Sequence, residues 1–257
     1  MTLLDLRSEA RAVDLRLPAR LDLDPLSRAS AIATWRGRMV NEHVSSRVFS
    51  ALAGQLDRAG LVGEVRRVER MIAEERRHGA LCAAVVEALG GDARAEVPPL
   101  PAVPEHPDAD PLEAAVRNIL SISCLSETVA VALIDAERRS AGPPELAALL
   151  AEILADEVQH ARTGWRLLAE LAPRFDLELR ERLGDWLVLA FGHLVEHELA
   201  HLPARPSPSP AAEAVGVCDG NAARALFFAT VEQVIVPGLR AHGLDGVGAW
   251  QAARHLA

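Results

Sequence analysis

Apolar residues recur every three or four positions along five long segments of the chain, and this spacing is typical of amphipathic helices. No segment alternates apolar and polar residues over a sustained length, so the pattern predicts an all-α fold. The five helices are expected over residues 25 or 27 to 59, 61–89, 111 or 112 to 140, 145–171 and 176–202. Residues 221–256 predict two shorter helices, with Pro237 in or near their junction.

The lengths of the connections predict how these helices are arranged. The first and second helices are separated by little more than Gly60, and the third and fourth by Gly142, Pro143 and Pro144. Helices joined by such short turns become antiparallel neighbours. The second and third helices are joined by a long proline-rich run that cannot be regular helix. Residues 25–173 are therefore predicted to form an antiparallel four-helix bundle with one long crossover.

The segments on either side of this bundle carry less information. Residues 1–24 are expected to form an N-terminal extension. Residues 174–257 are expected to form additional helices that pack on the bundle, with a Pro/Ser-rich linker at 203–212.

Two predicted helices carry a glutamate followed three positions later by a histidine. The second helix contains Glu75 and His78, and the fourth contains Glu157 and His160. Residues three apart lie on the same face of a helix, so each pair can offer a carboxylate and an imidazole to one metal ion. One such pair arises by chance in many helices, whereas two copies in two similar helical hairpins are a much stronger signal.

The first and third helices each place one carboxylate in an apolar stretch. Glu42 is the only acidic residue between Asp24 and Asp57, and Glu127 is the only one between Glu113 and Asp135. Burying a carboxylate is costly unless something pairs with it, and a metal ion is one such partner.

Positions along the hairpins predict that these residues meet. In an antiparallel hairpin, residues equidistant from the turn lie at the same height. The midpoint of positions 42 and 75 falls at 58.5, beside Gly60, and that of positions 127 and 157 falls at Gly142. Four glutamates would also balance the charge of two Fe(II) ions. Oxygen and imidazole ligands suit iron or manganese.

These segments resemble the ferritin-like di-iron carboxylate superfamily, in particular its oxidase or oxygenase branch. The resemblance covers about residues 35–170 and rests on NEHVSSRVF, AEERRHGALC, CLSETVAVAL and ADEVQHARTGW. It implies that two iron ions are held by six ligands: Glu42, Glu75, His78, Glu127, Glu157 and His160. Fe/Fe is expected, with Mn/Fe and Mn/Mn as alternatives.

The resemblance also assigns roles around the metals. Glu42 and Glu127 would each be the one ligand that its helix supplies. Glu75 and Glu157 would bridge the two metal ions or chelate one of them. Glu74 and Asp156 would hydrogen-bond His160 and His78, respectively, from outside the metal centre. From spacing alone, Glu74 and Asp156 could instead replace Glu75 and Glu157 as ligands, so that alternative stays open.

Composition excludes or disfavours several kinds of binding partner and reaction. The net charge of −9, from 36 acidic and 27 basic residues, disfavours a nucleic-acid partner. No stretch approaches the ~18 consecutive apolar residues of a membrane-spanning helix, and the N-terminus lacks the apolar core of a signal peptide. We therefore expect a cytoplasmic protein without a membrane partner. The three cysteines form no C-x-x-C pair, and the absence of tyrosine and lysine excludes tyrosyl-radical and Schiff-base chemistry.

Three functions fit these observations. The preferred one is an oxidase or oxygenase that activates dioxygen or peroxide to oxidise a small organic substrate. Ser123, Ser126, Ala130 and Gly164 would leave room for that substrate, and the helices after residue 173 would shape its pocket. Repeated turnover would need an external reductase, because no flavin or nicotinamide motif is present. The alternatives are a ferroxidase or peroxide-scavenging protein and a non-enzymatic metal-binding bundle; a homodimer is also compatible with the sequence.

The fifth helix carries a separate histidine stripe. His193, His197 and His201 are spaced four residues apart and share one helix face. They could bind another metal ion or line access to the first site, but such a stripe is more often a solvated helix face. We expect the latter.

Overall fold

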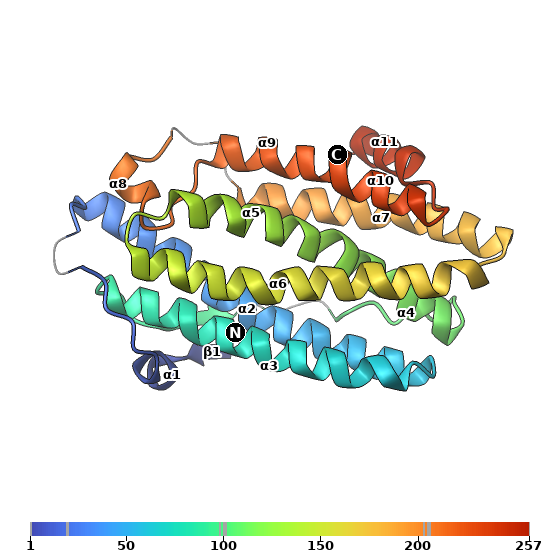
Figure 1. Cartoon of the computed structure of the whole chain (residues 1–257), viewed down its shortest axis with the longest axis horizontal. Helices are drawn as coiled ribbons and strands as arrows, with labels where there is room; N and C mark the ends of the chain where they lie inside the picture. The colour runs from blue at the N-terminus through green and yellow to red at the C-terminus, as the bar shows by residue number, and fades with distance from the viewer. Residues whose placement is uncertain are drawn as a thin grey trace.

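The computed structural model describes residues 2–18, 21–97, 99, 102–202, 204 and 207–256 (Figure 1). The predicted all-α class is confirmed, since helices dominate and the described residues contain one pair of four-residue strands. The long helices are α2 (Pro25–Arg58), α3 (Val62–Ala88), α4 (Pro111–Ile119), α5 (Glu127–Ser140), α6 (Pro144–Leu171), α7 (Leu177–His201), α9 (Gly220–Thr230) and α11 (Gly246–Leu256). The short elements are β1 (Thr2–Asp5), α1 (Arg7–Ala12), β2 (Arg94–Val97), the π-helical segments η1 (Leu120–Ser126) and η3 (Val231–Ile235), the 3₁₀ turn η2 (Ala172–Arg174), α8 (Pro210–Glu213) and α10 (Val236–Ala241).

Aspartate caps explain where several helices begin. Asp24 accepts hydrogen bonds from the backbone N–H groups of Leu26 and Ser27, and Pro25 occupies the first turn of α2. Asp110 caps α4 in the same way, and Asp176 caps α7. An aspartate at this position satisfies N–H groups that have no partner inside the helix, and proline there loses no hydrogen bond. The predicted starts of the five long helices lie within about two residues of the observed ones.

The helices lie in layers along one common direction (Figure 1). Helix α2 packs along α3, α5 packs along α6, and η1 contacts both α6 and α7. The turn between α5 and α6 is held from outside, because the Gly142 N–H donates to the carbonyl of Ala214 at 2.9 Å. A side chain at position 142 would place its Cβ 2.9 Å from that of Ala214, which explains why glycine stands there.

The last helices cover this arrangement and share its core. One cluster of buried apolar side chains runs from Phe49 on α2 through Leu125 in η1 to Phe191 on α7 and Phe227 on α9. Helix α7 packs against α11, and α9 packs against α5. The C-terminal segment is therefore continuous with the core around α2 to α6.

The N-terminal segment contains elements that the sequence pattern did not reveal. Strand β1 pairs antiparallel with β2, so that Thr2 faces Val97 and Asp5 faces Arg94. Helix α1 then packs on α3. Strands of four residues are too short to show a clear alternation, and their pairing joins positions about ninety residues apart. Of the predicted extension, residues 1, 19 and 20 lie outside the described residues.

The junction predicted near Pro237 lies elsewhere. The chain stays helical from α9 through η3 into α10, and Pro237 falls in the first turn of α10. The break comes after Ala241, where Gly243 adopts φ +75°, a conformation that favours glycine. The π-helical turn before Pro237 changes the local hydrogen-bond pattern, so proline does not end the helix there. The end of the predicted linker at 203–212 overlaps α8, which begins at Pro210, and residues 203, 205 and 206 lie outside the described residues.

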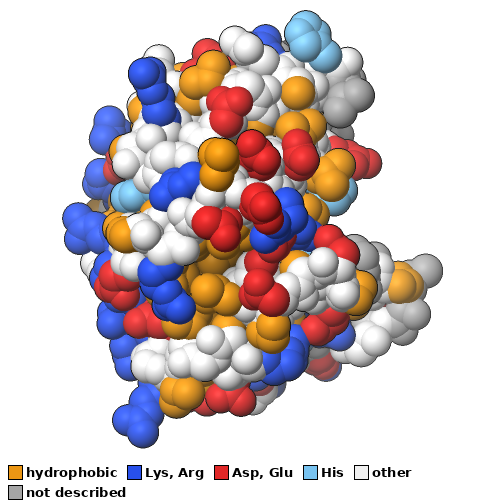
Figure 2. All heavy atoms as spheres, turned by 90° about the vertical axis from the view of Figure 1, so that its right-hand side faces the viewer, with side chains coloured by type: hydrophobic (Ala, Val, Ile, Leu, Met, Phe, Trp, Pro, Cys, Tyr) orange, Lys and Arg blue, Asp and Glu red, His pale blue; other side chains and the backbone are white. Residues whose placement is uncertain are grey.

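Two described segments, Pro111–Ser140 and Gly220–Ala241, are long and apolar enough to cross a membrane by length and composition alone. The first contributes Leu120 and Leu125 to the buried core, and the second contributes Phe227. Core helices of soluble proteins have these properties. At the end of the molecule where α2 turns into α3, acidic and basic side chains are interspersed around an exposed apolar strip (Figure 2). Cytoplasmic location stays a prediction.

Candidate metal centre

Six acidic and histidine side chains converge between four helices. Two overlapping groups have ligand atoms that all lie within 4.8 Å of one another. The first group contains Glu42, Glu75, His78 and Glu157; the second contains Glu75, Glu127, Glu157 and His160. Each group therefore has one histidine and one carboxylate of its own, and the two groups share Glu75 and Glu157. This arrangement can hold a metal ion.

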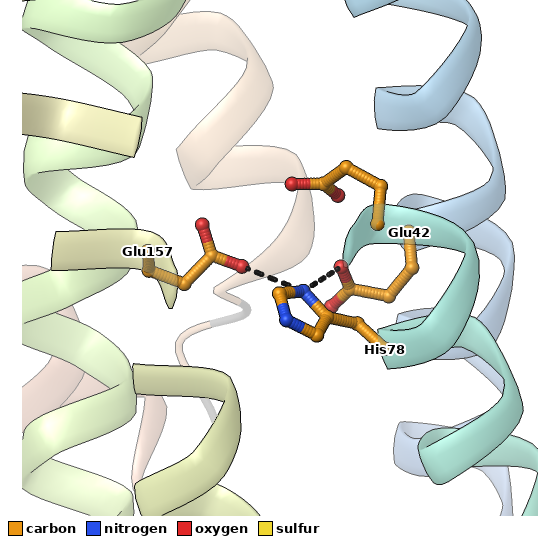
Figure 3. Close-up of side chains that lie close together, drawn as sticks. Glu42, His78 and Glu157 are labelled. Carbon is orange, nitrogen blue, oxygen red and sulfur yellow. Dashed lines mark ion pairs between the residues drawn. The ribbon is translucent and has the colours of Figure 1, made fainter. Parts of the chain in front are cut away.

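Glu157 lies between the two histidines. Its Oε1 is 3.2 Å from Nδ1 of His78, and its Oε2 is 3.2 Å from Nδ1 of His160. Glu42 approaches the same nitrogen of His78 at 3.6 Å, so carboxylates from α2 and α6 reach one imidazole of α3 (Figure 3). On the other side, Glu75 Oε1 lies 3.0 Å from Nδ1 of His160. Both histidines thus direct Nδ1 at the shared carboxylates.

Residues outside the cluster hold the other ring nitrogens. Nε2 of His78 lies 3.0 Å from Asp156 Oδ2, and Nε2 of His160 lies 2.9 Å from Glu74 Oε2. Both contacts are those predicted from the sequence. An imidazole that donates Nε2–H to a carboxylate keeps its Nδ1 lone pair available for a metal. Neither Glu74 nor Asp156 belongs to the two groups with ligand geometry, so the alternative in which they replace Glu75 and Glu157 is disfavoured.

The centre is buried as well as compact. His78 and His160 are completely buried, and Glu75 and Glu157 are 1% and 3% exposed. Glu127 is also buried, whereas the side chain of Glu42 retains 14% of its exposure. Burying so many ionisable groups is costly unless they neutralise one another or bind an ion.

In the metal-free protein, protons reduce this cost. Burial raises the pKa of Glu75 well above its ordinary value, and the negative charges of Glu42 and Glu157 raise it further. Burial likewise raises the pKa of Glu127, and the negative charge of Glu157 raises it further. Burial alone would lower the pKa of His78, but contacts with Glu157 and Glu42 outweigh it and raise the value to about 11.

The other histidine and the central carboxylate complete this pattern. Burial lowers the pKa of His160, yet contacts with Glu157 and Glu127 prevail and raise it to about 9. The two imidazoles in turn hold the pKa of Glu157 below its ordinary value, although burial opposes them. The centre is therefore a set of cationic imidazoles around an anionic carboxylate at neutral pH.

Two buried atoms indicate that the residues present suit a metal. Glu75 Oε1 and His78 Nδ1 have no hydrogen-bond partner of suitable direction, although charged neighbours lie close. A buried polar atom without a partner is rare in proteins and costs about 1–3 kcal/mol. Both atoms point into the cluster, where a cation would satisfy them.

A π-helical segment positions the third helix beside this centre. Segment η1 ends at Ser126, immediately before Glu127, and the Ser126 hydroxyl donates to the carbonyl of Ser121 at 3.1 Å. A π-helical turn shifts all following side chains around the helix axis, so η1 sets the direction of Glu127. The apolar periodicity of the sequence did not reveal it.

Part of the predicted substrate space is filled. A Cβ on Gly164 would lie 2.5 Å from the Cβ of Ser123, because α6 and η1 touch at this point. Gly164 and Ser123 therefore allow close helix packing and leave no room for a substrate, so the prediction was wrong for these two residues. Ser126 does line an open space, which we call the side cavity.

The side cavity has a volume of about 270 Å³ and is open to solvent. Its walls come from α2, residues 102–104 of the crossover, α4, η1 and α7. Helices α3 and α6, which carry the two Glu-x-x-His pairs, contribute none of its lining residues. Of the helices after residue 173, α7 lines this cavity, and that the cavity holds a substrate stays a prediction.

The histidine stripe lies at this cavity rather than in the metal centre. His193 and His197 are exposed lining residues of the side cavity, and the ring of His201 lies 4.4 Å from that of His197. None of the three belongs to a group with metal-ligand geometry among the described residues.

No protein family, curated protein or solved structure matches this chain in the comparisons. The fold and the site define its class by themselves: an all-α protein with a buried carboxylate–histidine cluster that can hold a metal ion.

Proposed function

We propose that the cluster binds two iron ions and that the loaded protein activates dioxygen or peroxide to oxidise a small organic molecule. The main support for this proposal is that two ligand groups share Glu75 and Glu157 while each has its own histidine. The pattern of one glutamate from each of two helices and Glu-x-x-His from each of the others is that of ferritin-like di-iron proteins. We therefore also propose that α2 to α6 form a ferritin-like bundle.

The donor atoms support iron over softer metals. Both groups consist of carboxylate oxygens and imidazole nitrogens, and neither contains a cysteine. Such ligands suit iron or manganese. Four carboxylates carry a charge of −4, which equals in magnitude the charge of two divalent ions. The loaded centre would therefore be neutral, which lowers the free-energy cost of burying it.

The chain's own residues have three tasks in this proposal. His78 and His160 bind through Nδ1 while Asp156 and Glu74 fix the rings. Glu75 and Glu157 span both positions, and the surrounding apolar side chains exclude bulk water. Two Fe(II) ions held in this way would supply the electrons for reduction of dioxygen. A separate one-electron reductant would then have to restore the ferrous state.

The side cavity favours an organic substrate over iron storage. One of its lining residues is Ser126, which immediately precedes Glu127. Its walls include α2, which supplies Glu42, and η1, which leads into the helix that supplies Glu127. A ferroxidase would not need an apolar chamber of this size.

Iron content after anaerobic reconstitution tests the proposal. Protein stripped of metal and loaded with Fe(II) should retain two irons per chain, with Mössbauer spectra of two coupled high-spin sites. Glu157→Gln should lower the content to one or none while circular dichroism stays helical. Glu170→Gln serves as the control, because Glu170 lies on the same helix, is half exposed and pairs with Arg166.

Three results would count against the proposal. Wild-type protein that holds at most one iron would show that the six residues do not form a two-metal centre. Equal iron content in both variants would remove Glu157 from the ligands. Loaded protein that retains two irons but consumes no dioxygen or peroxide would leave a metal-binding protein without the proposed oxidation.

A further inference from the structure

The side cavity lies beside the candidate metal centre along two separate helices. On α2, Val48 lines the cavity, and its neighbour Phe49 packs edge-on against the His160 ring with centroids 5.4 Å apart. In η1, Ser126 lines the cavity, and the next residue is Glu127. Two independent pairs of adjacent residues thus connect the cavity wall to the cluster.

The interior of the cavity is mainly apolar. Val48, Ile122, Ala190 and Leu194 contribute side chains from three elements. Besides the two histidines, the polar lining residues are Asn118, Ser121 and Ser126, and the hydroxyl oxygen of Ser121 is buried without a hydrogen-bond partner. The cavity volume of about 270 Å³ corresponds to about nine water molecules at ~30 Å³ each. This is enough for a ligand of about ten non-hydrogen atoms.

The α7 side of the cavity carries its ionisable groups. His193 and His197 are the only titratable residues among the lining residues that the structure describes, and both are exposed. Nδ1 of His197 lies 3.3 Å from Glu198, which leaves Nε2 to meet a ligand. This contact also raises the pKa of His197 and so favours its cationic form. No carboxylate or guanidinium lines the cavity within the described chain.

We propose that the side cavity binds a small amphipathic carboxylic acid, with its carboxylate at His193 and His197 and its apolar body directed along Val48 and Ile122 toward Ser126. Imidazole N–H groups are suitable donors to a carboxylate, and the apolar walls suit a hydrocarbon chain. That the acid is the molecule oxidised rests on the proposed function, whereas its binding does not.

Calorimetry with two probes of equal chain length tests the binding. Octanoate has ten non-hydrogen atoms, and 1-octanol has the same number of carbon atoms without the charge. Metal-free wild-type protein should bind octanoate at least about tenfold more tightly than 1-octanol, because hydrogen bonds to charged groups are the stronger ones. The double variant His193→Gln/His197→Gln should remove this preference and leave the affinity for 1-octanol unchanged.

Matched variants separate the cavity from the general surface. His201→Gln alters the same helix outside the lining residues and should keep the preference for octanoate. Ile122→Trp should fill the cavity and weaken both probes at least tenfold. Val103→Trp fills it from the crossover wall and provides the same test if Ile122→Trp does not fold. Equal affinity for the two probes in wild type, or unchanged binding in a folded filled variant, would overturn the inference.

Iron loading keeps this inference distinct from the proposed function. Octanoate should perturb the ligand-field spectrum of the anaerobic Fe(II)-loaded protein, because its chain approaches Glu127. Octanoate bound to protein that cannot hold iron would support the cavity and refute the metal proposal. Two bound irons with no octanoate binding would do the opposite.

Discussion

Asp156 contacts both His78 and Arg77 through the same carboxylate oxygen. Its Oδ2 lies 3.0 Å from Nε2 of His78 and forms an ion pair with Arg77, which also reaches Glu152 at 2.9 Å. On the opposite side, Glu74 contacts His160 but forms no ion pair with an arginine in the described part of the chain. The two halves of the cluster are alike in ligands and different in what supports them.

Asp156→Asn should weaken metal binding at the position next to His78. Loss of the charged partner leaves the imidazole less basic and less firmly oriented, and such outer contacts are worth about 10- to 100-fold in metal affinity. Anaerobic titration with Fe(II) should show one tight and one weakened position. Glu152→Gln is the control, because it changes the other partner of Arg77 and should alter affinity much less. Equal weakening of both positions would show that Asp156 does not act through His78.

Metal binding should release protons. His78 and His160 have pKa values of about 11 and about 9 in the metal-free protein, so both are protonated at pH 7 and must lose a proton to ligate. The raised pKa values of Glu75 and Glu127 add to the release. At least two protons per chain should therefore appear on full loading, and affinity should rise with pH. Calorimetry in two buffers of different ionisation enthalpy measures the number; release of less than one proton would contradict this protonation pattern.

Gly164→Ala should destabilise the fold by about 1–3 kcal/mol through overpacking. The added methyl group would lie 2.5 Å from the Cβ of Ser123 and 3.0 Å from its backbone carbon, neither of which can move freely. Gly184→Ala on α7 is the matched control, since a methyl group there meets nothing within 4 Å. It should stabilise the protein by about 0.4–1 kcal/mol. Denaturant unfolding of both variants compares the free energies, and equal values would refute the close contact between α6 and η1.

Features encoded near one another in the sequence were predictable. The helix starts at Pro25 and Pro111 were predictable to within about two residues, because the apolar periodicity and the prolines that indicate them lie in or beside the helices themselves. The convergence of Glu42, Glu75, Glu127 and Glu157 followed from their distances to Gly60 and Gly142, since a tight turn fixes which residues face each other. That these residues bind metal stays a proposal.

Features that depend on distant contacts were not predictable in this way. From the sequence alone, Gly164 indicates free space beside the helix. The structure shows instead that Ser123 of η1 packs directly against it. Each of the π-helical turns η1 and η3 shifts the side chains that follow it around the helix axis, but a single irregular turn is too short to be identified from apolar periodicity. Strand β1 requires β2, and four residues alone carry too little pattern to identify either.

The crossover between α3 and α4 is held at β2, before the residues that wall the side cavity, and at Pro104, the last of those residues. Strand β2 is paired with β1, and the carbonyl of Pro104 accepts hydrogen bonds from Gln55 and Asn118, both at 2.8 Å. These hydrogen bonds hold Pro104 in place in the cavity wall. Each methylene that stays inside would add about 0.8 kcal/mol of binding free energy, and each one that protrudes would add almost nothing. The chain would therefore discriminate among homologous acids by their length.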